Sequence, residues 1–522
     1  MTPSSASQQA LTRTALDTPD PARGTWRDWL ALALLMFPVL LVAVDNTALT
    51  FALPAIAGAL GTSGVELLWI VDAYPLVLAG LLVAMGSLGD RIGRRRLLII
   101  GSIGFAAVSA VTAFAPSAGW LIAGRAALGF FGAMLMPSTL SLIRNIFVDP
   151  NRRRLAIAIW AAGFSGGAAL GPIFGGWLVE QFWWGAVLLV AVPIMLPLLA
   201  FGPAFIPESK DPTPGRVDAP SILLSLLTMV PVVYGIKEFA TEGAGPLALG
   251  SLAFGLAMGA TFVRRQQRLK SPLLDMSLFR NRVFSMAITA NVLALFSFNG
   301  FILFLAQHLQ LLEGMSPSAA GMAMIPALVA TVVAGLAVVP VVRKVRPGFV
   351  VGTGLAMSAA GYSMVTFGSH ADGPALLLAA LLVLALGVGT AETISNDLIL
   401  GSVPAEKSGA ASAISETGYE VGALLGTAVL GSILTASYQQ NLRLPAGAVE
   451  AAGQGTAHAS ETLAGAMELA AGLPAPLAEA VRQAAGSAFD SGVHVTAAIG
   501  LVLMATAAVL AAVVLRRVPK AQ

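Results

Sequence analysis

The sequence predicts an all-α membrane protein with fourteen transmembrane helices, arranged as two six-helix bundles and an inserted helix pair. Its composition is the first observation: 57% of the 522 residues are hydrophobic and 11% are charged, whereas about 25% of a soluble domain is charged. Fourteen mostly apolar stretches are long enough to cross a bilayer, which takes about 20 residues. Basic residues concentrate in alternate connections between these stretches, as they do when Lys and Arg stay on one side of a membrane.

The fourteen stretches follow a polar tail and are separated by turn residues, such as those of segment 61–64. The tail, residues 1–28, is rich in Ser, Thr, Pro and charge, and we expect it to be disordered. The first stretch is too long for the core of a signal peptide. The predicted spans are 29–53, 66–87, 96–115, 119–142, 154–179, 183–206, 219–239, 245–263, 283–308, 317–342, 348–368, 374–397, 409–436 and 493–515.

The distribution of basic residues predicts the orientation. If the amino terminus is cytoplasmic, the cytoplasmic segments hold 26 of the 30 Lys and Arg residues, and the six short outer loops hold none. Arg443 and Arg482 lie in one long outer loop, 437–492, and Arg125 and Lys237 lie inside spans. Because transfer of basic residues across the membrane is disfavoured, we expect a multi-pass protein of the inner (cytoplasmic) membrane with both termini in the cytoplasm.

Glycines recur every four residues in two spans, which indicates an internal repeat. Such stripes let membrane helices approach closely, and each lies on the fifth helix of its half if spans one to six and nine to fourteen are the halves. The predicted domains are a bundle over 29–206, an inserted pair with its linker over 207–265, and a second bundle over 266–518 that includes loop 437–492. Two bundles around a midplane cavity are typical of a transporter. The stripes are Gly163, Gly167, Gly171 and Gly175, and Gly418, Gly422 and Gly426.

Four short motifs follow one another in the first half. They are Asp45-Asn46-Thr47 with Ala52-Leu53-Pro54, the loop Gly86-Ser-Leu-Gly89-Asp90-Arg91-Ile-Gly93-Arg94-Arg95-Arg96, the segment Arg125-Ala-Ala-Leu-Gly129, and Gly167-Ala-Ala-Leu-Gly171-Pro172-Ile-Phe-Gly175-Gly176. In this order the chain from Trp29 to Arg517 resembles the major facilitator superfamily, and within it the 14-helix drug:proton antiporters of the quaternary-ammonium and multidrug exporter type. Val190-Ala-Val-Pro193 departs from the pattern of many relatives, which carry Asn before Val-Pro.

The resemblance implies the major facilitator fold and antiport of drugs against protons. It also implies a packing role for the fifth span, carried by Gly163, Gly167, Gly171, Pro172, Gly175 and Gly176. The charged loop after the second span is able to latch the two bundles together in one conformation and release them in the other; the alternative is a simple anchor of positive charge at the cytoplasmic face. The candidate latch residues are Gly86, Gly89, Asp90, Arg91, Gly93 and Arg94.

Charged residues inside the first bundle are candidates for proton coupling, because charges in a membrane are costly and usually functional. Asp45 lies ~24 Å along its helix from the cytoplasmic end, and Asp72 and Arg125 lie ~9 Å from the outer ends of theirs. All three therefore share a similar depth. A carboxylate there is able to load and release protons under the influence of Arg125. The alternative is a static brace in which Arg125 pairs with one Asp.

The second bundle carries a further set of acidic candidates. Glu416 and Glu420 are four residues apart on span thirteen, so they share a helix face. Facing one cavity, they would repel each other, and at least one is expected to hold a proton when no cation is bound. They are predicted to serve both proton coupling and substrate binding. Glu392 on span twelve is predicted to bind substrate nearer the cytoplasmic end.

Aromatic and methionine side chains suit large apolar cations through dispersion and cation–π contacts. Each is alternatively a core or lipid-facing residue. The candidates for substrate binding are Trp69, Tyr74, Met134, Phe298, Phe301 and Tyr419.

Several other functions lack their sequence requirements. The chain has no cysteine, no HExxH pair and no phosphate-binding lysine loop, so we expect no enzyme activity, metal, cofactor or nucleotide. Gly163-Phe-Ser165-Gly-Gly167 matches a hydrolase elbow pattern, but it lies inside a membrane helix with no strand before it. The net charge of +3 is too small for a nucleic-acid binder.

The sequence thus predicts a proton-coupled multidrug efflux antiporter that exports amphipathic, mainly cationic drugs and dyes by alternating access. Its partners would be protons, small amphipathic or cationic substrates and the lipid bilayer, and we expect it to work as a monomer. Two alternatives remain: a proton-coupled exporter dedicated to one natural product or metabolite, and a membrane receptor or scaffold that does not transport.

Overall fold

The computed structural model describes residues 26–210, 218–269, 272–368, 373–404, 407–452 and 455–519, and its regular structure over these residues is helical. Thirteen helices of the described part are long and apolar enough to cross a membrane. A bent helix, α6 (Pro150–Gln181), makes a fourteenth when its two arms are counted as one span. The prediction of an all-α membrane protein is confirmed, and the predicted count of fourteen is met when α6 is included.

The bend in α6 has an identifiable cause. Its arms, Leu155–Ala168 and Leu170–Gln181, meet at 41°. Pro172 lacks an amide hydrogen and its ring crowds the carbonyl four residues earlier, which belongs to Ala168. That carbonyl accepts a hydrogen bond from the Thr47 hydroxyl of the neighbouring helix, 3.1 Å away. A backbone acceptor left without its helical partner is therefore satisfied from another helix, as the membrane interior requires.

The first bundle has its own hydrophobic core, built from residues between Ala31 and Ile206 together with Leu303. Within it, α6 packs along α2, and α5 packs between α3 and α4. Ser63 starts α3 with a capping box in which Ser63 and Glu66 exchange hydrogen bonds. The helices of this bundle are α2 (Trp26–Leu60), α3 (Gly64–Ile92), α4 (Arg94–Thr112), α5 (Ala118–Ile146), α6, α7 (Ala186–Leu189) and α8 (Ala191–Phe205).

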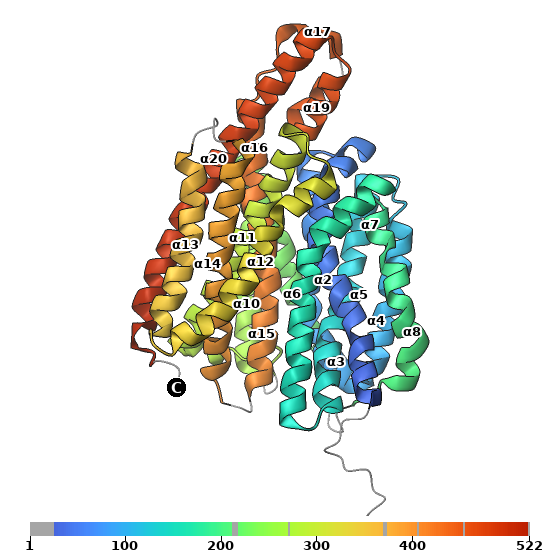
Figure 1. The fold of residues 1–522 in the computed structure, drawn as a ribbon, viewed down its shortest axis with the longest axis vertical. Helices are drawn as coiled ribbons and strands as arrows, with labels where there is room; N and C mark the ends of the chain where they lie inside the picture. Colours follow the sequence, from blue (N-terminus) through green and yellow to red (C-terminus); the bar gives the residue numbers. More distant parts are fainter. Residues whose placement is uncertain are drawn as a thin grey trace, which may run out of the picture.

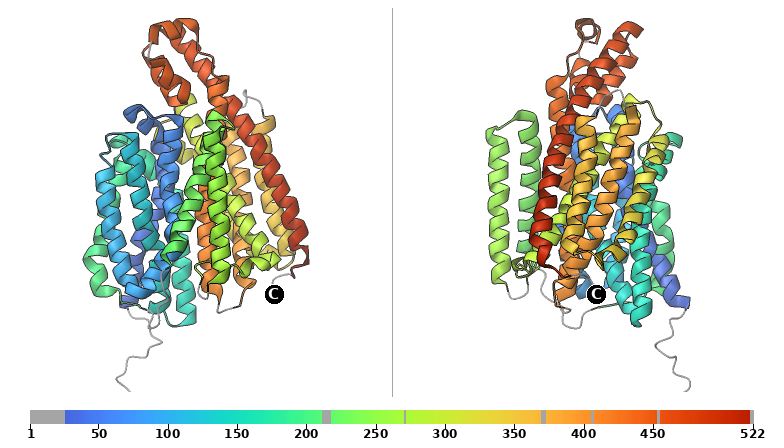
Figure 2. Two further views of the ribbon diagram at one scale, coloured as in Figure 1. Left: turned by 180° about the vertical axis from the view of Figure 1, so that it is seen from behind. Right: turned by 60° about the vertical axis from the view of Figure 1, so that its left-hand side comes forward.

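The inserted pair, α9 (Ala219–Glu242) and α10 (Pro246–Arg268), stands beside the bundles rather than between them. The right-hand view of Figure 2 shows both helices projecting at one side of the molecule. Helix α10 packs against α9, and α9 in turn contacts α3 of the first bundle and the middle of the thirteenth predicted span.

A second hydrophobic core is built from residues between Leu278 and Leu515 together with Phe51. The thirteenth predicted span is one continuous span over Ala410–Asn441, widened in its middle by a π-helical turn, η5. The remaining elements of this half are η1 (Leu278–Arg280), α11 (Arg282–Gln307), η2 (His308–Leu312), α12 (Pro317–Val342), α13 (Pro347–Phe367), α14 (Gly373–Gly401), α15 (Ser408–Leu425), η5 (Gly426–Leu430), α16 (Gly431–Asn441), α20 (Ala475–Val514) and η6 (Leu515–Arg517).

The long predicted loop, 437–492, is mostly helical. Figure 1 shows α17 (Ala446–Ala452) and α19 (Leu463–Ala471) projecting beyond the bundles, at what we call the capped end, and α18 (Gly455–Glu461) links them. Helix α20 begins at Ala475, eighteen residues before the predicted start of the last span at 493. The segment is rich in alanine, which favours helix, and its apolar residues, such as Val481 and Phe489, are buried. The helix therefore extends well beyond the predicted span, because the apolar run that starts at 493 marks the membrane segment and not the whole helix.

Helix packing at glycines gives a direct test of this fold. A Cβ atom on Gly387 of α14 would lie 2.7 Å from the Ser358 amide nitrogen of α13, whereas one on Gly401 would have nothing within 4 Å. We expect Gly387→Leu to lower the free energy of unfolding by roughly 1–3 kcal/mol through overpacking, measured as a lower melting temperature in detergent. The matched control, Gly401→Leu, should melt like the parent; equal losses in both variants would contradict the packing described.

Candidate functional site

A buried ion pair links three helices of the first bundle. Arg125 of α5 is 2% exposed, and its Nη1 lies 2.6 Å from Oδ2 of Asp45 on α2. Its Nε donates a hydrogen bond to the Ile70 carbonyl of α3, 3.2 Å away, and its guanidinium lies 4.6 Å from the ring centroid of Tyr74. Because a buried charge is tolerated only when paired and hydrogen-bonded, these contacts explain how an arginine stays inside the bundle.

Asp72 has a different partner, which the sequence analysis did not identify. Its Oδ2 lies 2.8 Å from Nζ of Lys237 on α9, and both side chains are at most 1% exposed. The Lys237 ammonium lies 4.0 Å from the ring centroid of Trp69. The three charges of similar predicted depth are thus divided between two ion pairs. The position of Lys237 inside a predicted span was the sequence feature that pointed to this ion pair, because such a charge requires a nearby partner.

The two acids of α15 face the first bundle. The Glu420 carboxyl accepts a hydrogen bond from the Asn46 side chain of α2, and Glu416 interacts electrostatically with Arg144 of α5. The glycine stripe of the same helix lies against α11, where a Cβ on Gly422 would lie 2.5 Å from the Val292 carbonyl oxygen. At about 100° per residue, Glu420 and Gly422 point about 160° apart, so the acids and the glycines of α15 face nearly opposite neighbours.

Glu392 and Tyr419, predicted separately from the sequence, belong to one polar network. The Tyr419 hydroxyl donates a hydrogen bond to Glu392 across α14 and α15, 2.7 Å away. Asn396 donates to Tyr419 and accepts a hydrogen bond from Ser415, 2.9 Å away. The network provides a carboxyl group, a phenol and an amide close to the two acids of α15.

The other predicted substrate residues lie in several environments. Met134 and Phe301 belong to the cores of the first and second bundles, and Tyr74 is fully buried beneath Arg125. Phe298 is partly buried at the edge of the second core. Trp69 carries Lys237 on its face, so it already takes part in a cation–π contact.

The charged loop between α3 and α4 binds to its own bundle in this conformation. Asp90 pairs with Arg94, whose Nη1 donates to the Pro137 carbonyl, 3.2 Å away. Arg95 donates to the Ile206 carbonyl, 3.0 Å away. Gly93 separates the two helices at φ 110°, a backbone conformation that favours glycine. The described partners of these arginines lie in the first bundle, so the loop does not hold the bundles together here.

The glycines of α6 lie against two different helices, α2 and α12. Gly167, Gly171 and Gly175 lie against α2. Gly176 instead faces the second bundle, where a Cβ would lie 2.5 Å from the Pro317 carbonyl oxygen of α12. Gly321 of α12 meets Pro172 equally closely. The two bundles therefore touch backbone to backbone near the capped end.

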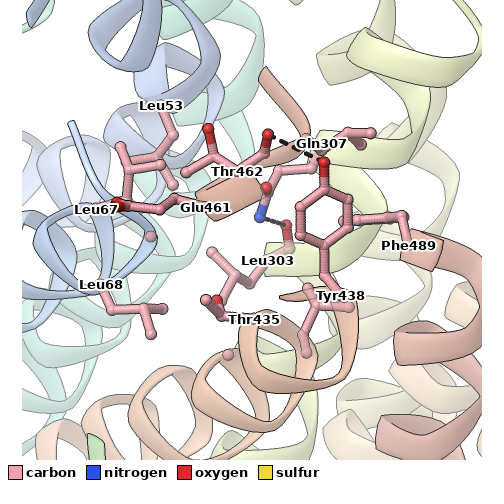
Figure 3. Close-up of a pocket in the computed structure, with 14 residues that line it drawn as sticks. Leu53, Leu67, Leu68, Leu303, Gln307, Thr435, Tyr438, Glu461, Thr462 and Phe489 are labelled. Carbon is pink, nitrogen blue, oxygen red and sulfur yellow. Dashed lines mark hydrogen bonds between the residues drawn. The ribbon is translucent and has the colours of Figure 1, made fainter. Parts of the chain in front are cut away.

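A small cavity lies where the bundles meet under the cap, as Figure 3 shows. Leu68 of the first bundle and Leu303 and Phe489 of the second line it, and Gln307 and Glu461 add polar groups. Its volume is about 40 Å³, far below the roughly 300–1,000 Å³ of a typical small-molecule site. In this conformation the bundles leave little space between them under the cap.

The chain belongs to the Major Facilitator Superfamily, which residues 35–427 match. It is 53% identical to the multidrug efflux pump LfrA of Mycolicibacterium smegmatis, over 96% of this chain and 99% of that protein. It is 38% identical to the methyl viologen resistance protein SmvA of Salmonella typhimurium, over 89% of this chain and 93% of that protein.

Among solved structures, the chain shares its fold with a bacterial homologue of the human lysosomal transporter Spinster in an inward-facing, unoccupied conformation. The TM-score is 0.60 and the identity 18%, over 94% of this chain and 98% of that one. The chain is therefore a multi-pass membrane transporter and not an enzyme, and the superfamily indicated by the sequence motifs is confirmed.

If Arg125 and Asp45 form a buried ion pair, removing one partner should destabilise the protein more than removing both. Arg125→Leu leaves the Asp45 carboxylate buried without its cation, which typically costs roughly 3–5 kcal/mol. We expect a large fall in the melting temperature in detergent, and recovery of most of it in the double variant Asp45→Asn/Arg125→Leu. Arg482→Leu, at an exposed arginine, is the control for loss of charge alone. A double variant no more stable than Arg125→Leu would argue against the pair.

Proposed function

We propose that this transporter exports amphipathic, mainly cationic drugs and dyes across the cytoplasmic membrane in exchange for protons, by alternating access. One observation carries the proposal: Glu416 and Glu420 lie on a membrane helix of the second bundle and face the first, with Glu420 bound to Asn46. The exchange of a proton for a cation needs ionisable groups at the interface that moves. The relatives named for multidrug efflux and for resistance to methyl viologen, an organic dication, support the same function.

The exchange follows from the cost of charge in a low-dielectric interior. A carboxylate there is stabilised either by a proton or by a bound cation. Protonation of Glu416 or Glu420 from outside removes the charge that holds the cargo, which then leaves. Loss of that proton to the cytoplasm restores the charge and lets the next cation bind. Glu392 and Tyr419 extend the polar surface available to the cargo.

The basic residues support the orientation in which both termini are cytoplasmic and the capped end is outside. Arg94 and Arg95 lie at the end of the first bundle away from the cap, where α3 ends and α4 begins. In this orientation the nearly closed cavity under the cap is the outer exit. The loop Gly86–Arg96 is then a cytoplasmic latch that is released here and engages the second bundle when the cytoplasmic side closes.

Efflux should be visible in whole cells. In a pump-deficient bacterium that expresses the chain, we expect ethidium accumulation to fall several-fold relative to cells with an empty vector, because cargo leaves against protons. A protonophore should remove the difference. A panel of cationic dyes, neutral drugs and anionic dyes measures breadth: export of one compound class alone indicates a dedicated exporter, and accumulation unchanged across the panel rejects the proposal.

Glu416 and Glu420 of α15 should differ from an exposed carboxyl group in their effect on proton movement. In proteoliposomes with an imposed pH gradient, we expect Glu420→Gln and Glu416→Gln each to lower the proton movement induced by cargo at least tenfold, because the group that alternates between proton and cation is lost. Glu479→Gln, at an exposed acid of α20, is the matched control and should behave like the parent. Normal proton movement in the double variant Glu416→Gln/Glu420→Gln would remove both residues from the mechanism.

A further inference from the structure

The Asp72–Lys237 ion pair joins the inserted helix pair to the first bundle. Its atoms are 2.8 Å apart and its side chains are at most 1% exposed. Burial of two charges costs several kcal/mol per ion before their attraction is counted, so such a pair is a poor way to stabilise a helix contact. Its presence in the apolar interior indicates a function that needs charge at this position.

Three parts of the chain meet at the pair. A separate apolar cluster surrounds it, with Leu76 from α3, Val233 from α9, and Leu424 and Ala428 from the thirteenth predicted span. Trp69 packs against the same cluster and contacts the ammonium group. The first bundle, the inserted pair and the second bundle therefore share one small interface, which excludes water from the charges.

The two oxygens of Asp72 bind different parts of the chain. Oδ2 faces Lys237 of α9, and Oδ1 accepts a hydrogen bond from the Thr427 hydroxyl of η5, in the second bundle. Helix α9 is attached to α3 at a second level, where the Ser225 hydroxyl donates to the Gly80 carbonyl, 3.0 Å away. The Lys237 contact thus joins α9 to the first bundle, and the Thr427 contact crosses between the bundles. Helix α9 also packs against η5 and α16 of the second bundle.

Thr427 lies in the π-helical turn of its span. Such single-turn widenings are frequent at functional sites. The turn lies near the capped end, since Gly431, the residue that follows it, lines the small cavity under the cap. A separation of the bundles at this end has to break the hydrogen bond between Thr427 and Asp72.

We infer that Lys237 is a positioning residue for transport: it holds Asp72 as an anion directed at Thr427, and the Asp72–Thr427 hydrogen bond keeps the capped end closed. This inference rests on the proposed alternating-access function. Asp72 is then a contact of the outer gate and not a carrier of protons, a different role from the one predicted from the sequence. The inserted helix pair acquires a role as well, because it supplies the cation that keeps the gate residue charged.

The test measures opening at the capped end without measuring transport. The chain has no cysteine, so Leu67→Cys, in the cavity lining, introduces a single thiol whose reaction rate with a maleimide in detergent reports opening. In this background we expect Thr427→Val to raise the labelling rate roughly tenfold, the effect of losing a hydrogen bond to a charged acceptor. Lys237→Met should raise it too, and Thr427→Ser should restore the parent rate.

The control is Thr417→Val, since the Thr417 hydroxyl donates to the Ala413 carbonyl of its own helix, 2.9 Å away. Its labelling rate should equal that of the parent. Because Lys237→Met leaves an unpaired buried anion and is able to unfold the protein, the neutral double variant Asp72→Asn/Lys237→Met is measured beside it. The double variant should fold and label fast. Parent-like labelling in folded Thr427→Val and in the folded double variant overturns the inference.

A second experiment, which measures proton movement during transport, distinguishes this inference from the proposed function. In proteoliposomes, Asp72→Asn/Lys237→Met should still move protons when cargo is added, although at a lower rate, because Glu416 and Glu420 are intact. Loss of proton movement with cargo binding retained would make Asp72 a proton carrier and overturn the inference. A parent chain that moves no cargo, while Thr427→Val labels faster than Thr427→Ser, would reject the proposed function and leave the gate contact established.

Discussion

The constraint on which the structure depends is that no charge or backbone polar group stays unpaired in an apolar interior. Arg125 is buried because Asp45, the Ile70 carbonyl and the Tyr74 ring surround it. The bend at Pro172 is accommodated because Thr47 supplies the hydrogen bond that the Ala168 carbonyl lost. Each of these contacts joins different helices, so satisfying the polar groups also fixes how the helices are arranged.

The same constraint separates permanent contacts from contacts that change. Arg125 and Asp45 lie in one bundle, so their ion pair persists through a rigid movement of the bundle. Contacts between the bundles, over the described residues, include the close backbone approach of α6 to α12, a hydrogen bond from Ser318 to Glu180, and hydrogen bonds at Thr427 and Glu420. These hydrogen bonds and van der Waals contacts have to break and form again each time the interface opens.

Much of the fold was predictable from the sequence, because the spans, the orientation and the family each follow from a pattern that extends over many residues. The partners of single charges were not, because Asp45 and Asp72 lie at the same depth and one-dimensional spacing does not show which of them Arg125 faces. The pairing of Asp72 with Lys237 depends on where α9 docks, which composition does not encode. Glu420 and Gly422 lie on nearly opposite faces of one helix, since two residues turn it by about 200°. Only its neighbours, α2 and α11, reveal what each face contacts.

Helix α20 runs without interruption for 40 residues from the cap into the second bundle. At 1.5 Å per residue it is about 60 Å long, roughly twice the thickness of the hydrocarbon core. Because the helix is continuous, a tilt of its embedded half is transmitted to its outer half, and with it to α17 and α19, which pack against it. Since α19 also contacts α2 of the first bundle, the projecting helices connect the last membrane helix of one bundle to the first membrane helix of the other.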